Sequence, residues 1–569
     1  MAEKVDLRSG TGMAEATYSC SSVEFFHSTV TKTAIEKLAS KKNLVIYCGA
    51  GTTIDRTGLG WAALITSIFT GGTSKGYPTD EEIKLMAKTE ASPLQLASIL
   101  TQYSLENFST DVKMQENLGA RLASLLYQNA SWAGGLTSEF IAQLAFEVSA
   151  GSGGSVTIVT TNYDTFIETR IRELCTGFSS VQPEDVLADG ADEIVQTNQR
   201  TVSVNAISND QLEQPLEVNH SADGVQFVYL HGSVDAAGTH RGTLVLSEAD
   251  YQRTRQYSVE LLSLLFSRQQ SAVVILGASL TDPPLIEALA VTRKNAEDPG
   301  NKISRVCVLP ISSTGYVRHG LSPQAMSQMK RHITKRGRLL GVDILIPDFH
   351  FQVAQFGYEL SLAAAERPYS TSDERYGMRL SRWFTDWEKT NEKHEEFSAK
   401  FFAYSQKRLA LLRSSYFDYD TDDNGEDESL RLEIWARTGR GTRQLSLIAS
   451  SLGVLTDKTV RRCEPLSVTS TNASVRAFQE GRPLHVDATD ILRSGKADVT
   501  SRWKSYLSVP IKNDDVVPVG VVTLASTRTR DSSGLPSGIS QRMEQIVDMF
   551  RDLGTLFLDN PTDLPGPPI

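Results

Sequence analysis

Four segments of the sequence place glycines or polar side chains directly after a run of apolar residues. They are NLVIYCGAGTT (residues 43–53), SVTIVTTNYD (155–164), QFVYLHGSV (226–234) and AVVILGASLTDPPL (272–285). Glycines at such a point let the backbone approach a phosphate group, and polar side chains there are well placed to contact a ligand. The segments therefore predict a site for a nucleotide-like ligand.

The first candidate is the turn that follows the apolar run 43–48. It consists of Gly49, Ala50, Gly51 and Thr52. A helix beginning after this turn would add amide donors and the positive end of its dipole. The turn is not the GxGxxG fingerprint, and glycine turns after strands are common, so a purely structural turn is the alternative.

Two further runs deliver side chains that could take part in catalysis. Thr161, Asn162 and Asp164 follow the second run, and His231 ends the third, next to a glycine that gives access. A histidine can exchange protons near neutral pH. The alternatives are a helix cap for the Asn or Asp and a structural role for the histidine.

The fourth run ends in Gly277, Ser279 and Asp282, before Pro283 and Pro284. These residues are placed to line the ribose of a nucleotide. The alternative is a simple capped turn into the helix that one of the prolines begins.

The elements that position these residues form an α/β fold. Strands are predicted for the apolar runs 43–48, 156–160, 226–230, 272–276, 306–309 and 342–346, with helical patterns such as 94–103 and 118–127 between them. Strands that alternate with helices predict a Rossmann-like parallel sheet, and ligands bind at the carboxyl ends of such strands.

The remainder of the chain has a different character. Residues 366–429 are predicted to form a helical connector that ends in an acidic, solvated linker, Asp418 to Glu428. Residues 430–560 are predicted to form an α+β unit. Its expected strands are 431–436, 505–511 and 519–526, followed by a helix over 539–558.

Composition narrows the classes of function. The formal net charge of −11 disfavours general nucleic-acid binding, because no basic field attracts phosphates. No apolar run approaches a membrane span, and the first residues lack a signal-peptide core, so we expect a cytoplasmic protein. The five cysteines form no CxxC pair, so we expect no metal.

Taken in order, the four motifs resemble the SIR2 family. They are GAG, T-x-N-x-D, HG and G-x-S-x-x-DP, and the resemblance covers residues 20–365. It is closer to the SIR2-like branch found in bacterial anti-phage proteins than to the protein-deacylating sirtuins, and LVLSEADY at 244–251 also fits that branch. Two departures are the six residues between Gly51 and Gly58, where five are usual, and the absence of the paired cysteines of protein-deacylating sirtuins.

The resemblance implies a catalytic site for NAD. In that site Asn162 would orient the ribose or water, Asp164 would hold Asn162 or the sugar, and His231 would act as general base. The residues implied to bind NAD itself are Gly49, Ala50, Gly51, Thr52, Thr161, Gly277, Ser279 and Asp282. Without a zinc module to build a peptide groove, we expect water to attack and release nicotinamide and ADP-ribose. The alternatives are an NAD-dependent protein deacylase and a non-catalytic sensor of NAD or ADP-ribose.

The C-terminal unit resembles a GAF domain. The resemblance rests on G-x-P-x-x-V-D at Gly481 to Asp487, Val509-Pro510 and Val519-Gly520-Val521. It implies a sensor or an oligomerisation domain, with a pocket where Arg482, His485 and Trp503 meet a small polar ligand. We therefore expect a homo-oligomeric anti-phage effector of the abortive-infection type, controlled by a small-molecule or protein activator.

Overall fold

The structure is a computed structural model of the whole chain. It describes residues 25–26, 28–70, 79–88, 93–105, 111–128, 135–151, 154–179, 202–213, 224–310, 323–365, 394–417, 419, 427–437, 444–455, 462–467, 470–491, 502–513, 517–536 and 540–559.

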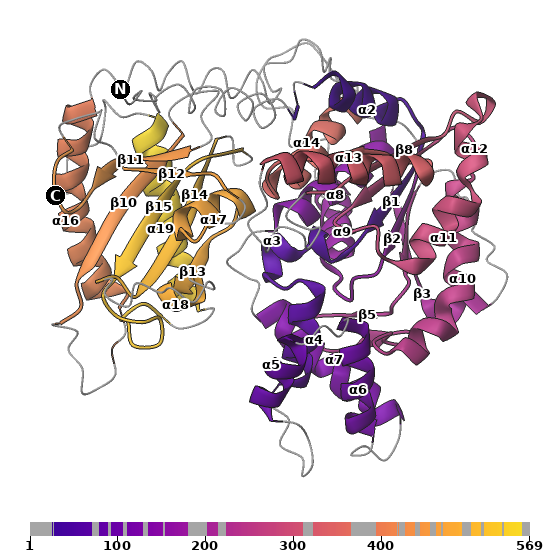
Figure 1. Cartoon of the computed structure of the whole chain (residues 1–569), viewed down its shortest axis with the longest axis horizontal. Coiled ribbons are helices and arrows are strands. Elements are labelled where there is room, and N and C mark those ends of the chain that lie inside the picture. Colours follow the sequence, from indigo (N-terminus) through magenta and orange to yellow (C-terminus); the bar gives the residue numbers. More distant parts are fainter. Residues whose placement is uncertain are drawn as a thin grey trace, which may run out of the picture.

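A seven-stranded parallel sheet organises the first part of the chain, which we call the parallel-sheet region (Figure 1). The strands lie in the order β3-β4-β2-β1-β7-β8-β9. Their bounds are β1 Asn43–Cys48, β2 Ser155–Thr160, β3 Ser203–Ser208, β4 Gly224–Tyr229, β7 Ser271–Leu276, β8 Ser304–Val308 and β9 Asp343–Leu345. Every residue of β7 is buried, as expected of a strand covered on both faces.

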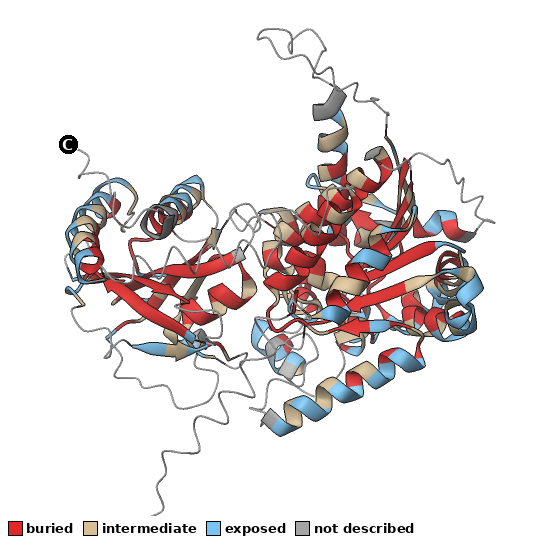
Figure 2. Ribbon diagram, turned by 90° about the horizontal axis from the view of Figure 1, so that it is seen from above, coloured by how far each residue is buried: buried red, intermediate tan, exposed pale blue. Residues whose placement is uncertain are grey.

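Helices cover both faces of this sheet, which confirms the predicted Rossmann-like α/β fold. One face packs against α2 Thr29–Ala39, α8 Leu136–Phe146, α9 Phe166–Ser179 and α14 Phe351–Ala364. The other packs against α10 Glu248–Phe266, α11 Pro283–Val291 and α13 Pro323–Leu339. Figure 2 shows the sheet as a buried layer between helices with exposed outer sides.

A group of four helices, which we call the helical lobe, lies beyond the carboxyl ends of the strands (Figure 1). It contains α4 Trp61–Phe69, α5 Asp80–Lys88, α6 Pro93–Leu105 and α7 Asp111–Ala123. Their buried side chains form one apolar cluster with Tyr163, Val234, Leu244 and Leu246, which follow sheet strands. The shorter elements of the region are α3 Ile54–Thr57, α12 Arg293–Glu297, β5 Ser233–Val234 and β6 His240–Arg241.

The second sheet has six antiparallel strands and defines the antiparallel-sheet region. Its order is β12-β11-β10-β15-β14-β13. The bounds are β10 Leu430–Ala436, β11 Gln444–Ser450, β12 Cys463–Pro465, β13 Leu484–Asp487, β14 Ser505–Asn513 and β15 Val517–Ser526. Helices α16 His394–Ser415 and α19 Gln541–Asp559 pack on one face of the sheet, and α17 Ala473–Glu480 packs on the other. The short α18 spans Ala488–Ile491.

Two features differ from the predicted connector. Helix α16 buries Phe397, Phe401 and Leu412 against the antiparallel sheet, so it belongs to a core instead of linking two cores. Glu428, expected in a solvated linker, is 1% exposed and accepts hydrogen bonds from Ser526 and other groups of the region. The sequence could not show this, because an acidic run is solvated in most contexts and only the fold provides buried donors. Residues 366–393 and most of the acidic run lie outside the described residues.

Within the described part of the chain, no helix combines the length and the apolar character that a membrane crossing requires.

Candidate functional site

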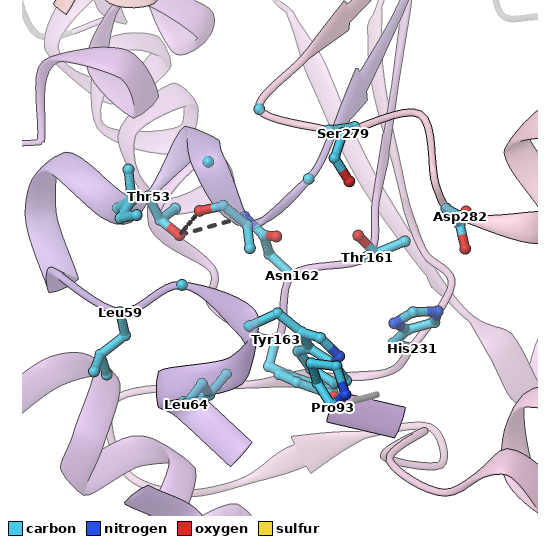
Figure 3. Close-up of a pocket in the computed structure, with 18 of the residues that line it drawn as sticks. Thr53, Leu59, Leu64, Pro93, Thr161, Asn162, Tyr163, His231, Ser279 and Asp282 are labelled. Carbon is cyan, nitrogen blue, oxygen red and sulfur yellow. Dashed lines mark hydrogen bonds between the residues drawn. The ribbon is translucent and has the colours of Figure 1, made fainter. Parts of the chain in front are cut away.

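A cavity of about 590 Å³ lies where β1, β2, β4 and β7 end, between the parallel sheet and the helical lobe (Figure 3). Its size suits a ligand as large as a drug or a nucleotide. Of the residues singled out from the sequence, those that line it are Gly49, Ala50, Gly51, Thr161, Asn162, Asp164, His231, Gly277, Ser279 and Asp282. Thr52 is fully buried behind the wall and does not line it.

The glycines of the first and fourth motifs pack against each other. A Cβ atom on Gly51 would lie 2.7 Å from the Cα atom of Gly277, and one on Gly49 would lie 2.7 Å from the Gly277 carbonyl oxygen. Gly277 also has φ of +64°, which favours glycine. The structural alternative thus explains why these positions are glycine. The backbone amides of Gly49, Gly51, Thr52 and Thr53 already donate to carbonyl oxygens of the protein. The turn would therefore contact a ligand by packing against it and not through these amides.

Asn162 is held in place from behind by the glycine turn. Its Nδ2 donates to Oγ1 of Thr52 at 3.0 Å, and its backbone amide donates to Oγ1 of Thr160 at 3.0 Å. Thr52 is therefore a supporting residue and not a lining one. Asn162 is only 7% exposed yet reaches the cavity, and its hydrogen bonds give the carboxamide a fixed orientation there (Figure 3).

Asp164 is a buried carboxylate with no ion pair among the described residues. Its Oδ1 accepts the backbone amide of Phe166 at 3.4 Å, as a cap of α9 would, so the capping alternative holds alongside the exposure to the cavity. Burial raises the pKa of Asp164 to about 6, against the effects of the Thr53 hydrogen bond and the charge of Arg56. Asp164 is thus mostly ionised at pH 7, but its ionisation inside the protein costs free energy.

His231 presents a neutral imidazole to the cavity. Burial lowers its pKa to about 4, although a hydrogen bond with the backbone of Thr161 acts in the opposite direction. Its ring centroid lies 5.6 Å from that of Tyr251 and 6.5 Å from that of Tyr163. The ring is neutral at pH 7, the form in which an imidazole can accept a proton, and the burial that keeps it neutral also makes it a weaker base.

The far end of the cavity contains a hydrogen-bonded pair that the sequence did not reveal. The hydroxyl of Tyr47 donates to Oδ2 of Asp282 at 2.6 Å, and Tyr47 is fully buried. Burial raises the pKa of both groups. Nearby, the hydroxyls of Ser279 and Thr281 are 2.6 Å apart. Polar oxygens at this end suit the hydroxyl groups of a sugar.

Aromatic side chains form one wall of the cavity, and sequence reasoning missed them. The rings of Trp61 and Tyr163 stack with centroids 6.1 Å apart, and Tyr251 faces His231. Tyr163 lies inside the T-x-N-x-D motif, so its place between two selected residues was an available signal. Trp61 lies only ten residues after Gly51, in the stretch that follows the glycine turn, whereas His350 comes from a distant part of the chain and no spacing rule connects it to the site.

The lining favours the formation of positive charge. Among the described residues, none that line this cavity is a lysine or an arginine, while Asp164 and Asp282 both reach it. A carboxylate without a cation partner stabilises a cationic transition state more than a paired one does. The arrangement can therefore support cleavage of a bond whose breaking leaves a cation, with proton transfer to His231.

A second cavity, of about 340 Å³, lies in the antiparallel-sheet region. Trp503 lines it as expected, but Arg482 and His485 do not. The expectation for Arg482 and His485 was wrong because both follow the C-terminal end of α17, whereas the cavity lies at the N-terminal end of that helix. The charged and aromatic residues that line it with Trp503 are Arg431, Glu433, Trp435, Arg462, Glu464 and Tyr506.

Comparison with protein families identifies one match. Residues 156–313 match the family model of the SIR2-like domain. The matched segment contains Asn162, Asp164, His231 and Gly277 and excludes the glycine turn after β1. No curated protein matches the chain. The match supports a SIR2-like assignment for this segment. SIR2-like domains bind NAD.

Proposed function

We propose that this protein hydrolyses NAD⁺ to nicotinamide and ADP-ribose. The observation that carries the proposal is the convergence of Asn162, Asp164 and His231 on one cavity within the SIR2-like segment. Two properties of these residues favour glycosidic cleavage: the carboxylate has no ion pair among the described residues, and the histidine is neutral at pH 7. The aromatic wall offers a flat surface for the nicotinamide ring.

In this mechanism the bond between the nicotinamide nitrogen and C1′ of the ribose breaks, and positive charge develops on the sugar. The negative charge of Asp164 stabilises that charge, and the carboxamide of Asn162 orients the ribose or the attacking water. Water forms the new bond to C1′ and transfers its proton to His231. The electron pair of the broken bond leaves with neutral nicotinamide.

Two alternatives use the same cavity. An NAD-dependent protein deacylase would remove an acyl group from a peptide, and a non-catalytic sensor would bind NAD or ADP-ribose and release no nicotinamide. Within the described residues, no group of histidine, cysteine and acidic side chains has the geometry of a metal site. An acyl-peptide assay and a nicotinamide assay on the same preparation separate the three functions.

The first test replaces the two residues closest to the proposed chemistry. Asn162→Ala and His231→Ala should each reduce nicotinamide release by roughly 100-fold or more, because each removes a group that acts on the transition state. Release is measured by chromatography, with circular dichroism to show that the fold is retained.

The matched control is His240→Ala. His240 lies on β6, its Nδ1 donates a hydrogen bond to the Gly242 carbonyl oxygen at 3.0 Å, and it does not line the cavity. It should leave nicotinamide release unchanged. Equal release by the wild type, Asn162→Ala and His231→Ala would contradict the site, whereas tight NAD binding without any release would favour the sensor.

We also propose that the antiparallel-sheet region, as a GAF-like domain, controls this activity in a homo-oligomeric anti-phage effector. Supporting this, Phe478 of α17 packs on Phe349 and Phe351, the neighbours of cavity-lining His350. An activator must bind the active state more tightly than the quiet one, since equal binding shifts nothing.

To test this control, purified full-length protein is assayed with protein-free extracts of phage-infected and uninfected cells. The extract of infected cells should increase nicotinamide release at least about tenfold, which corresponds to roughly 1.4 kcal/mol of difference in binding. High release without any extract, and no change on its addition, would contradict control by a small molecule.

A further inference from the structure

The two regions meet in a packed aromatic contact. The rings of Phe349 and Phe351 stack with centroids 5.5 Å apart, and the ring of Phe478 meets them edge-on at 5.9 and 5.8 Å. All three side chains are at least 95% buried. A contact of this kind fixes the end of α17 against the segment that carries His350 into the large cavity.

Gly481, the residue after α17, brings the antiparallel-sheet region unusually close to Phe351. Gly481 has φ of +68° and ends the helix, and a Cβ atom there would lie 2.7 Å from the Cβ atom of Phe351. Only glycine meets both conditions without strain. This close approach directs the next residue, Arg482, toward the parallel-sheet region.

Arg482 then contacts the loop that forms one side of the cavity. Its guanidinium is paired with Glu480 at 2.9 Å, and its side chain is 17% exposed. A Cβ atom on Gly58 would lie 3.1 and 3.2 Å from the two terminal guanidinium nitrogens, so the guanidinium rests on the Gly58 backbone. The residues that directly follow Gly58, namely Leu59, Gly60 and Trp61, line the cavity.

We propose that Arg482 is a positioning residue for the NAD site, contributed by the antiparallel-sheet region. It holds the loop from Gly58 to Trp61 in the conformation that sets the aromatic wall. The proposal rests on the proposed function for the identity of the ligand, but the contact with the loop does not. A planar guanidinium, fixed by Glu480, covers a glycine backbone in a way that a lysine ammonium cannot.

The test compares Arg482→Ala and Arg482→Lys with a matched control, Arg476→Ala. Arg476 lies on α17 and also pairs with Glu480, at 3.5 Å, but the atoms nearest to a Cβ on Gly58 all belong to Arg482. The first readout is amide hydrogen exchange of residues 58–61 in the full chain. Exchange should be roughly threefold or more faster in both Arg482 variants and unchanged in Arg476→Ala.

The second readout is the binding of ADP-ribose by calorimetry and the KM for NAD⁺. Both constants should increase roughly tenfold in Arg482→Ala, with a smaller change in kcat, and the melting temperature should match that of Arg476→Ala. Unchanged exchange at residues 58–61 would overturn the inference whether or not NAD⁺ is cleaved. If exchange at residues 58–61 is faster in the Arg482 variants but the wild type neither binds nor cleaves NAD⁺, the proposed function is contradicted and the positioning role stays in place.

Discussion

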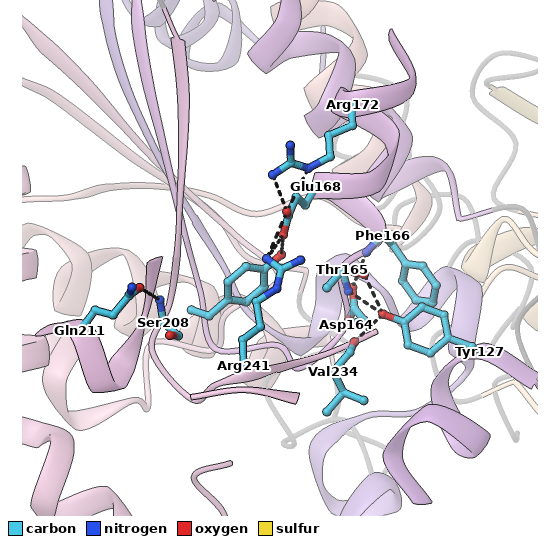
Figure 4. Close-up of polar contacts among 11 residues, drawn as sticks. Tyr127, Asp164, Thr165, Phe166, Glu168, Arg172, Ser208, Gln211, Val234 and Arg241 are labelled. Atoms are coloured by element: carbon cyan, nitrogen blue, oxygen red, sulfur yellow. Dashed lines mark hydrogen bonds and ion pairs between the residues drawn. The ribbon is translucent and has the colours of Figure 1, made fainter. Parts of the chain in front are cut away.

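Asp164 and Glu168 are two buried carboxylates one helical turn apart, and their surroundings differ completely (Figure 4). Glu168 accepts hydrogen bonds from Arg172 at 2.8 and 3.0 Å, from Arg241 at 3.1 and 3.2 Å and from the Tyr229 hydroxyl at 2.8 Å. Asp164 accepts a long hydrogen bond from the Phe166 amide at 3.4 Å, has a further one with Thr53, forms no ion pair with a described residue and faces the cavity.

The difference separates a structural carboxylate from a candidate catalytic one. Glu168 ties α9 to β4 and β6, and its charge is balanced by two arginines. The charge of Asp164 is left without such a partner among the described residues, and burial raises its pKa to about 6. Burying an unpaired carboxylate costs free energy, and such groups with strongly shifted pKa values are concentrated at functional sites.

The largest expected effect comes from removing the charge of Asp164. Asp164→Asn should reduce nicotinamide release by roughly 100-fold, because the developing positive charge on the ribose loses its partner. The same variant should be more stable at pH 8 by about 1–3 kcal/mol, since an amide does not incur the cost of ionisation. Urea unfolding measures the second effect. Lower stability together with full activity would reverse the roles assigned to the two carboxylates.

The next effect is the loss of stability on removing Glu168. Glu168→Ala leaves the buried Tyr229 hydroxyl and two arginines without their acceptor, and should cost about 3 kcal/mol in the free energy of unfolding. The rate of nicotinamide release per folded molecule should change less than about twofold. Glu173→Ala, an exposed carboxylate on the same helix, serves as control and should change stability by less than about 0.5 kcal/mol. A selective loss of activity without unfolding would place Glu168 in the site.

The smallest effect is a dependence on pH. Because the folded-state pKa of Asp164 is raised, the carboxylate gains a proton as the pH falls through about 6, and the rate should decrease about tenfold per pH unit below that value. The stability contributed by protonated Asp164 is present at low pH and is lost as the pH rises through 6. Rate profiles from pH 5 to 8 test this. The residual rate of Asp164→Asn should lack the decrease, and a flat wild-type profile would contradict the raised pKa.

Most of the parallel sheet could be predicted because its central strands are continuous apolar runs. The strand over 43–48 has the predicted bounds, and the strands near 156, 226, 272, 306 and 342 were placed to within a few residues. The edge strand β3, with sequence SVNAIS, was missed because its burial is partial and half of its residues are polar. In the second sheet, β11, β12 and β13 were missed for similar reasons: short length or interruption by serines.

The site could be predicted only where residues follow strands. Asn162, Asp164 and His231 do so, and parallel strands bring their carboxyl ends to one edge. Trp61 follows the glycine turn by only ten residues, whereas His350 reaches the same cavity through packing between distant segments, which no local pattern encodes. Their positions, and the contact of Arg482 with Gly58, depend on how whole helices pack.

The aromatic contact around Phe349 and Phe351 limits how this chain can be divided. Both side chains belong to the same buried cluster as Trp435, Phe478 and Val521 of the antiparallel-sheet region. A fragment that ends near residue 430 would expose these rings to water and would be prone to aggregate. If the antiparallel-sheet region were transferred to another enzyme, the segment from Phe349 to Phe351 would have to be transferred with it to cover its apolar surface. The two regions therefore have to be exchanged as a pair.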